Sequence, residues 1–479
     1  MGVATKLQQL GRSQSARPGL LAASATLAMC GFVYLLPLYA SLLLIPLAGA
    51  ALLGPRGTAV ALALLWVPVS LGGGLAPWRG LARSGVPAPL LQEFRWLLIG
   101  WTTALIASRK LEPDRASSTS GFLQLSILYA LALCVLSLLS SVNVLTSVAK
   151  VMAWLLGTLT LLRAFSRLAP ADHAWLIRFF VGLCSTLVIL SLIAKPLPGS
   201  ALSSARYLRG ILGHSQLLGA IAGGLGAYLI CHLFLQRPKR NLAIQLLVVA
   251  CVTALLLSQS RTALISMVSA IALALIPRGE GRYSTNRLSL SVYIGLGILV
   301  TALIIASDAQ LLNSILLKNR DSGGFLESFL SSRTSQINNL LGVFLENPIV
   351  GTGFGVASGS QWLQSGKGFS LSAPSEKGFI VVAVLQETGL TGFILFAIYL
   401  TYLVRRLAAC PDPRLVAAAA AGLISNFGEA TLFSYGGIGY FHWFWIALAM
   451  TLPMTIPQPV TAKSLPITPP SLLSPRAEG

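Results

Sequence analysis

Runs of about 20 predominantly apolar residues recur along nearly the whole chain, and they limit its fold more than any other feature. A helix needs roughly 20 such residues to cross about 30 Å of hydrocarbon. The runs are continuous rather than alternating, which favours membrane helices over a membrane β-barrel. With 55% hydrophobic and 10% charged residues among 479, the chain is too apolar for a water-soluble protein. The sequence therefore predicts an all-α, polytopic integral membrane protein with about 12–14 transmembrane helices.

The apolar runs and the loops between them predict the organisation of the chain. We expect a cytoplasmic N-terminus over 1–19, a membrane bundle of about eleven spans over 20–306, a long extracytoplasmic loop with short helices over 307–377, a second bundle of about three spans over 378–456, and a disordered cytoplasmic tail over 457–479. The predicted spans include 288–306, 378–404, 414–432 and 437–456.

The charged residues give the expected topology. Lys and Arg number 34 against 14 Asp and Glu, so the formal net charge is +20. In a soluble protein this excess would suggest nucleic acid, but here most basic residues lie in short loops between apolar runs. Alternate loops are basic, as the positive-inside rule requires when the N-terminus is cytoplasmic. We therefore predict a multi-pass protein of the cytoplasmic (inner) membrane that contacts membrane lipid and no nucleic acid.

Several arginines fall on the side of the membrane where this rule expects few basic residues. Arg206 and Arg209 precede a predicted span, Arg261 lies between two spans, and Arg333 lies in the long loop. A guanidinium is charged at any relevant pH and offers a fork of donors that fits phosphate oxygens. These residues indicate anion binding on the extracytoplasmic side.

The long loop contains one clear helical pattern. Ile337, Leu340, Leu341 and Phe344 recur at the spacing of a helix with one apolar face, and Pro348 is expected to end it. Such a helix would lie along the membrane surface or cap a cavity between the spans. The GTGFG run that follows, residues 351–355, is a flexible turn whose backbone amides are candidates to hold a phosphate.

Four sequence pieces carry a resemblance to a known family. They are RGILGHSQLLG (209–219), SQSRTAL (258–264), SRT followed by FLENPIVGTGFG (332–355), and LQETGLTGF (385–393). Together they resemble the O-antigen ligase and polymerase superfamily of bacterial membrane proteins over roughly residues 200–405. The resemblance implies a GT-C-like, metal-independent membrane glycosyltransferase without a cofactor. Its donor would be a glycan on a polyprenyl diphosphate, and its acceptor a sugar hydroxyl on another lipid-linked glycan or a lipid A core.

The resemblance also assigns site residues. It implies that Arg261 and Arg333 clamp the donor's diphosphate, with Arg209 and Arg206 as further candidates. His214, in RGILGH, fits best as a polar residue at a helix start, and its closeness in sequence to Arg209 keeps it as a possible site residue.

The chain departs from the family pattern where the span before ETGLTGF begins. Ligases of the family carry a His-Asn pair there, with the histidine as the proposed base, whereas this chain has Gly378 and Phe379. Glu376 is the nearest residue able to accept a proton, and Lys377 would favour its ionised form. A Glu-Lys pair at a helix entry is also explained as a favourable N-terminal charge with a surface partner.

Two function classes stay open at this level. One is transfer or polymerisation of lipid-linked glycan, with ligase and polymerase not separated. The other is transport of a small anion such as bicarbonate, for which the misplaced arginines and the carboxylates Glu387 and Glu429, within or near spans, would select and couple ions. The six cysteines are dispersed without a CxxC pair and indicate neither a zinc site nor a disulfide framework.

Overall fold

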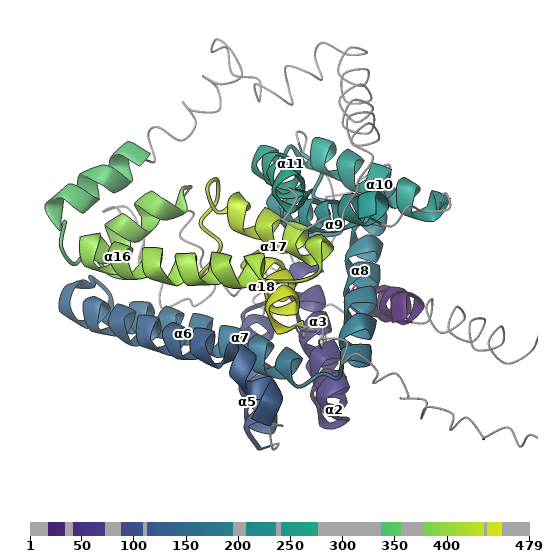
Figure 1. Ribbon diagram of the computed structural model, residues 1–479, viewed down its shortest axis with the longest axis horizontal. Helices are drawn as coiled ribbons and strands as arrows, with labels where there is room; N and C mark the ends of the chain where they lie inside the picture. Colours follow the sequence, from purple (N-terminus) through teal and green to yellow (C-terminus); the bar gives the residue numbers. More distant parts are fainter. Residues whose placement is uncertain are drawn as a thin grey trace, which may run out of the picture.

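The protein is seen in a computed structural model that describes residues 18–33, 42–71, 88–108, 113–194, 207–235, 241–275, 337–355, 378–434 and 438–452. These residues fold into helices and contain no strand, which confirms the all-α class (Figure 1). In chain order the helices are Pro18–Val33, α2 (Leu44–Leu52), α3 (Pro55–Leu71), α5 (Ala88–Ser108), α6 (Pro113–Ser140), α7 (Val144–Ser166), α8 (Pro170–Ile193), α9 (Ser215–Leu235), α10 (Leu242–Ser258), α11 (Arg261–Leu275), Ile337–Glu346, α16 (Ile380–Ala408), α17 (Pro413–Ser425) and α18 (Ile438–Thr451).

Length and composition identify membrane-crossing helices in the described part of the chain. Five are long and apolar enough to cross a membrane: Thr119–Ser140, Val144–Ser166, Pro170–Ile193, Ser215–Leu235 and Ile380–Ala408. Together they confirm a multi-pass membrane protein. The predicted span 288–306 and the N-terminal and C-terminal segments 1–17 and 453–479 lie outside the described residues.

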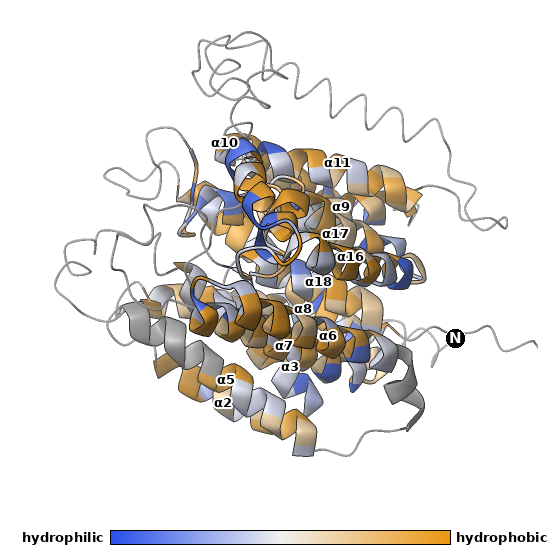
Figure 2. Cartoon of the chain, turned by 90° about the vertical axis from the view of Figure 1, so that its left-hand side faces the viewer, coloured by the Kyte–Doolittle hydropathy of each residue, from blue (hydrophilic) through white to orange (hydrophobic). Residues whose placement is uncertain are grey.

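Hydrophobic residues predominate in these helices (Figure 2). On α6, Leu128, Leu131, Val135 and Leu138 are exposed by 54–63% and follow one another at helical spacing. A stripe of this kind would be unfavourable in water, whereas lipid tails solvate it. The helices of this bundle therefore present a face suited to hydrocarbon.

The helix α16 differs from the single predicted span 378–404. Gly389 has φ 62° and ψ −168°, which is not helical, so two helices meet there and the chain changes direction (Figure 1). The part from residue 390 to Ala408 rises about 28 Å at about 1.5 Å per residue, enough to cross the hydrocarbon by itself. The segment after Gly389 could therefore form the span by itself, and the residues from Ile380 to Thr388 form a separate short helix.

The helix α17 is also shorter than predicted. It ends at Ser425 rather than at 432, because Asn426 turns the chain and residues 426–434 form an irregular loop before α18. We call residues 426–434 the hub loop. Its contacts, described below, connect the parts of the candidate site.

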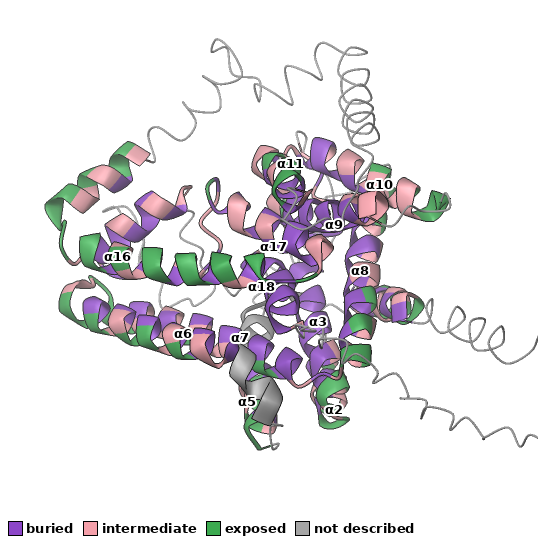
Figure 3. Cartoon of the chain, viewed as in Figure 1, coloured by how far each residue is buried: buried purple, intermediate pink, exposed green. Residues whose placement is uncertain are grey.

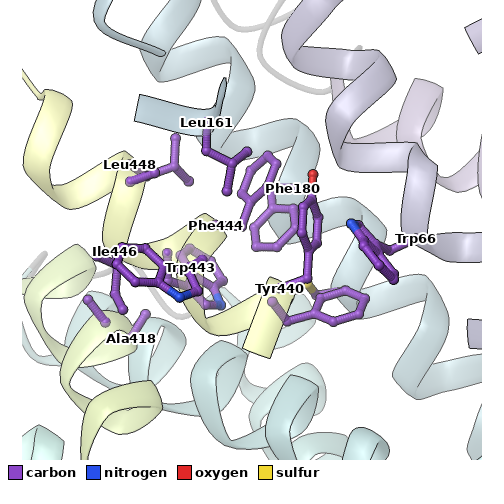
Figure 4. Close-up of a cluster of buried hydrophobic side chains, with 14 of the residues drawn as sticks. Trp66, Leu161, Phe180, Ala418, Tyr440, Trp443, Phe444, Ile446 and Leu448 are labelled. Atoms are coloured by element: carbon purple, nitrogen blue, oxygen red, sulfur yellow. The ribbon is translucent and has the colours of Figure 1, made fainter. Parts of the chain in front are cut away.

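The helix α18 is the centre of the bundle. All of its side chains from Gly439 to Thr451 are buried, so it is enclosed on every side (Figures 3 and 4). Phe444 stacks on Phe180 of α8 with 3.9 Å between ring centroids. Glycines on the neighbouring helices allow this close packing: a Cβ on Gly224 of α9 would lie 2.9 Å from the Trp445 indole nitrogen. Because lipid is as apolar as these side chains, van der Waals packing rather than exclusion of water holds α18 in place.

Candidate functional site

Arg261 stands at a sharp junction between two helices. α10 ends at Ser258 and is followed by Gln259, whose φ of 52° is left-handed, and Arg261 is the first residue of α11. The backbone carbonyl of Ser260 accepts from the Leu264 amide at 3.1 Å, so it begins the new helix. A helix N-terminus carries partial positive charge, and the half-buried guanidinium adds a full one. The junction is therefore suited electrostatically to an anion.

The segment that holds Arg209 is tied to the same junction. The Leu208 amide donates to the Leu257 carbonyl near the end of α10 at 2.9 Å. The Gly213 amide donates to the Ser70 carbonyl of α3 at 3.0 Å. Gly210, with φ +66°, packs so closely on Ser191 of α8 that a Cβ there would lie 2.1 Å from the serine Cβ. Arg209 is half-buried within this segment, which is fixed by three helices.

His214 lies in the same segment but is a helix-start residue in its contacts. Its side chain is exposed, and its Nδ1 accepts from the Gln216 amide at 3.2 Å at the beginning of α9. This bond satisfies one of the amides that a helix start leaves without a partner. A role for His214 in a site stays a prediction.

The first two family pieces, 209–219 and 258–264, lie against each other. A Cβ on Gly219 would be 2.3 Å from the Ser260 Cβ, and one on Gly223 would be 3.2 Å from the Ala263 carbonyl oxygen. Glycine at both positions lets α9 approach the start of α11 at backbone distance. The segments that carry Arg209 and Arg261, about 50 residues apart in the sequence, thereby pack at one junction.

The last two family pieces, 332–355 and 385–393, also pack together where both are described. At Gly389 the helix opens, and the loop segment 347–353 pairs with the opened backbone; we call this pairing the latch. Four backbone bonds join it: Thr352 N to Gln386 O at 3.1 Å, Gly353 N to Glu387 O at 2.9 Å, Leu390 N to Pro348 O at 2.8 Å, and Thr391 N to Ile349 O at 3.2 Å. Carbonyls and amides that α16 cannot satisfy internally are thus satisfied by the long loop.

The latch overturns one interpretation of the GTGFG run. Its amides were candidates to hold a phosphate, but those of Gly351, Thr352 and Gly353 already donate to the carbonyls of Asn347, Gln386 and Glu387. Each amide has one hydrogen to give, so these three do not form an anion cradle. The glycines instead allow the loop backbone to lie close to the backbone of α16, since a Cβ on Gly351 would lie 2.4 Å from the Thr388 nitrogen.

The hub loop connects the two pairs of family pieces. Asn426 organises it, since its buried Oδ1 accepts from the Thr431 amide at 2.8 Å and the Leu432 amide at 2.6 Å. The Asn426 carbonyl accepts from the Ile380 amide at the start of α16 at 3.1 Å. A Cβ on Gly428 would lie 2.2 Å from the Thr262 side chain, directly beside Arg261.

An aromatic contact joins the hub loop to the residue that follows the latch. The Phe433 ring lies 5.3 Å from the ring of Phe354, the residue that follows the latch, with an edge-on geometry. Sequence reasoning missed this loop because the run around it was assigned to one span, 414–432. The signal that marks it is NFGEATLF, residues 426–433, where Asn, Gly and Glu interrupt an otherwise apolar run.

The hub loop brings a carboxylate into the neighbourhood of Arg261. Glu429 follows Gly428, is half-buried, and lies on the loop that touches Thr262. Glu387, by contrast, is buried at 7% exposure beside the latch, and its backbone carbonyl accepts from Gly353. The start of α16, where the family histidine is absent, is occupied by Phe379, whose ring lies 5.8 Å from Phe427 of the hub loop.

Four predicted site residues lie outside the described residues: Arg206, Arg333, Glu376 and Lys377. The structure places the segments that carry Arg209 and Arg261 against each other, and every site assignment stays a prediction. In the described ranges no group of three or more His, Cys, Asp or Glu side chains is placed to hold a metal ion.

Comparison with known proteins supports the family resemblance of one part of the chain. Residues 246–397 match a family model described as O-antigen ligase. The match includes the α10–α11 junction and the latch, and it begins after the piece 209–219. A search of curated proteins finds no match. Residues 246–397 are thus similar to the O-antigen ligase family, which supports the resemblance that the motifs carry.

Proposed function

We propose that this protein transfers or polymerises a polyprenyl-diphosphate-linked glycan, such as an O-antigen or a related surface polysaccharide, at the outer face of the cytoplasmic membrane. The observation that supports it best is the α10–α11 junction, where the segment that carries Arg209 is bonded to the end of α10, close to Arg261 in the matched O-antigen ligase domain. The family match supports glycan transfer in general; the donor is the one that the resemblance implies, and the basic junction is compatible with its diphosphate.

The arginines would act on the leaving group. When the glycosidic bond breaks, negative charge develops on the diphosphate, and donors already in position stabilise it without reorganisation. Arg261 offers a fork of donors at a helix N-terminus, and Arg209 is fixed on the adjoining segment. Arg206, three residues from Arg209, and Arg333 on the long loop would complete the clamp. No metal ion or cofactor is needed for this stabilisation in the proposed mechanism.

The acceptor hydroxyl needs a base, and two carboxylates are candidates. Glu376, with Lys377 favouring its ionised form, stands two residues before Gly378 in the sequence. Glu429 stands on the hub loop, which bonds to the start of α16 and touches the residue after Arg261. Separate Glu376→Gln and Glu429→Gln variants distinguish them. Only loss of the true base removes the increase of the transfer rate with pH that ionisation of its carboxyl group produces.

The test is transfer by purified protein in lipid nanodiscs supplied with a polyprenyl-diphosphate glycan. We expect longer or transferred glycan from the wild type and little from Arg261→Ala. Arg405→Ala, which removes an exposed arginine from the last turn of α16, is the matched control and retains activity. A wild type that neither extends nor transfers glycan overturns the proposal.

Glycan profiles of cells lacking the protein separate the two reaction types. Loss of long chains with single repeats retained indicates a polymerase, whereas long chains stranded on the polyprenyl carrier indicate a ligase. Uptake of labelled bicarbonate into proteoliposomes, dependent on Arg261 and without any glycan product, would indicate the transport alternative.

A further inference from the structure

Within the described residues, two large apolar side chains of the long loop are exposed, and we call them the loop edge. Leu345, at the end of the helix Ile337–Glu346, is 73% exposed, and Ile349, in the turn that follows, is 69% exposed. Leu340 of the same helix is 4% exposed and packs inward. The helix is therefore apolar over a wider arc than the protein covers.

The latch fixes the depth of this edge relative to α16. The Ile349 carbonyl accepts from the Thr391 amide at 3.2 Å, and the Pro348 carbonyl accepts from the Leu390 amide at 2.8 Å. Leu390 begins the segment that crosses the hydrocarbon, and groups joined by one hydrogen bond lie at nearly the same depth. Ile349 is thus level with the first turn of a membrane span.

The neighbours of this edge on α16 form a stripe suited to lipid. Leu390, Ile394 and Ile398 are exposed by 53%, 53% and 54%, and their spacing of four places them on one face (Figure 3). This face continues from the loop edge into the depth of the span. The loop edge and the stripe form one apolar surface.

A second apolar surface flanks the loop edge on the side of the α6–α7 turn. The Val142 amide donates to the Thr352 carbonyl at 3.4 Å, which joins this turn to the latch. Leu139, Val142 and Leu145 are exposed by 72%, 59% and 70%. The loop edge therefore lies between two exposed apolar surfaces, each at the end of a helix long enough to cross a membrane.

We infer that the edge formed by Leu345 and Ile349 inserts into the acyl chains of the leaflet on the side of the long loop. The occupant is lipid because the edge is continuous with lipid-facing surfaces on both flanks and lies at their depth. Glu346 and Asn347, which are exposed between the two apolar residues, lie at the level of the headgroups. The inserted edge and the latch together hold the loop at the membrane surface. The inference is independent of the proposed glycan transfer.

The test places an environment-sensitive fluorophore on single cysteines at positions 345, 349 and 339 in the full chain. The six native cysteines are first replaced by alanine or serine. Asn339 is the matched control, because it is exposed on the polar arc of the same helix. Each labelled protein is placed in proteoliposomes that contain either nitroxide-labelled phospholipid or a water-soluble nitroxide.

Insertion predicts a blue-shifted emission at positions 345 and 349 that is lost on adding nitroxide-labelled lipid. The probe at position 339 should instead be quenched by the water-soluble nitroxide. Probes at 345 and 349 that water-soluble nitroxide quenches as strongly as the probe at 339 overturn the inference. Protection from both quenchers also overturns it, because that result would mean that protein covers the edge. Circular dichroism and gel filtration of each labelled protein identify any variant that is misfolded. If the variant labelled at 345 or at 349 is misfolded, the other of these two positions tests the inference.

Discussion

Replacing Gly389 by alanine tests the latch, because this glycine is required both by conformation and by space. Its φ of 62° and ψ of −168° belong to a region that is essentially open to glycine alone, and strain of this kind costs about 1–3 kcal/mol. An added Cβ would also lie 2.3 Å from the Ile349 carbonyl oxygen, closer than real Cβ contacts. That carbonyl accepts from Thr391, so moving it breaks a latch bond and costs roughly a further 1–3 kcal/mol.

We therefore expect Gly389→Ala to weaken the latch by about 2–6 kcal/mol, which is a factor of roughly thirty or more in its opening equilibrium. Hydrogen exchange with mass spectrometry, on protein in nanodiscs, measures this in the peptides that contain residues 347–353 and 386–391. Exchange in α9 and α18 should be unchanged.

Gly342→Ala is the matched control for this prediction. Gly342 lies in the neighbouring helix Ile337–Glu346, and a Cβ there would meet nothing within 4 Å. Alanine is the better helix former by about 1 kcal/mol, so protection in the control should be equal or higher. Unchanged exchange in Gly389→Ala, or an equal loss of protection in Gly342→Ala, would refute the reasoning.

Three further substitutions test the junction, the hub loop and the central helix. Arg261→Lys keeps the charge but loses the fork of donors, so glycan transfer should fall at least about tenfold, and recovery of wild-type rates would contradict the clamp. Asn426→Ala leaves the buried Thr431 and Leu432 amides without their acceptor and should lower stability by roughly 2–4 kcal/mol in a thermal-unfolding assay; an unchanged melting temperature would contradict the role of Asn426. Gly224→Leu, against Trp445 of α18, should cost about 1–3 kcal/mol, whereas Gly100→Leu, where a Cβ meets nothing within 4 Å, should be nearly neutral.

Arg261 and Arg209 show which features of the site the local sequence can predict. Arg261 was identified as a candidate because it stands where topology expects few basic residues, and the structure places it at the start of α11. Its closeness to Arg209 depends on Gly219 and on the bond between Leu208 and Leu257, which join segments remote in the sequence. No periodicity or composition carries that information.

The break in the helix at Gly389 could not be predicted from the local sequence. A single glycine in an apolar run is compatible with a continuous helix, so the run 378–404 was predicted as one span. The non-helical backbone exists because the loop segment 347–353 supplies partners for the opened amides and carbonyls. The hub loop was missed for a similar reason, since the turn at Asn426 is stabilised by amides five and six residues further on.

The sequence by itself determined that the chain is a bundle of membrane helices and that residues 246–397 are similar to the O-antigen ligase family. Hydropathy suffices for the helices, because lipid requires each span to satisfy its own backbone within one local run. The tertiary structure decided where α16 breaks, which family pieces meet, and which loop joins them. Those features depend on hydrogen bonds and glycine contacts between residues far apart in the chain, such as Pro348 with Leu390 and Asn426 with Ile380.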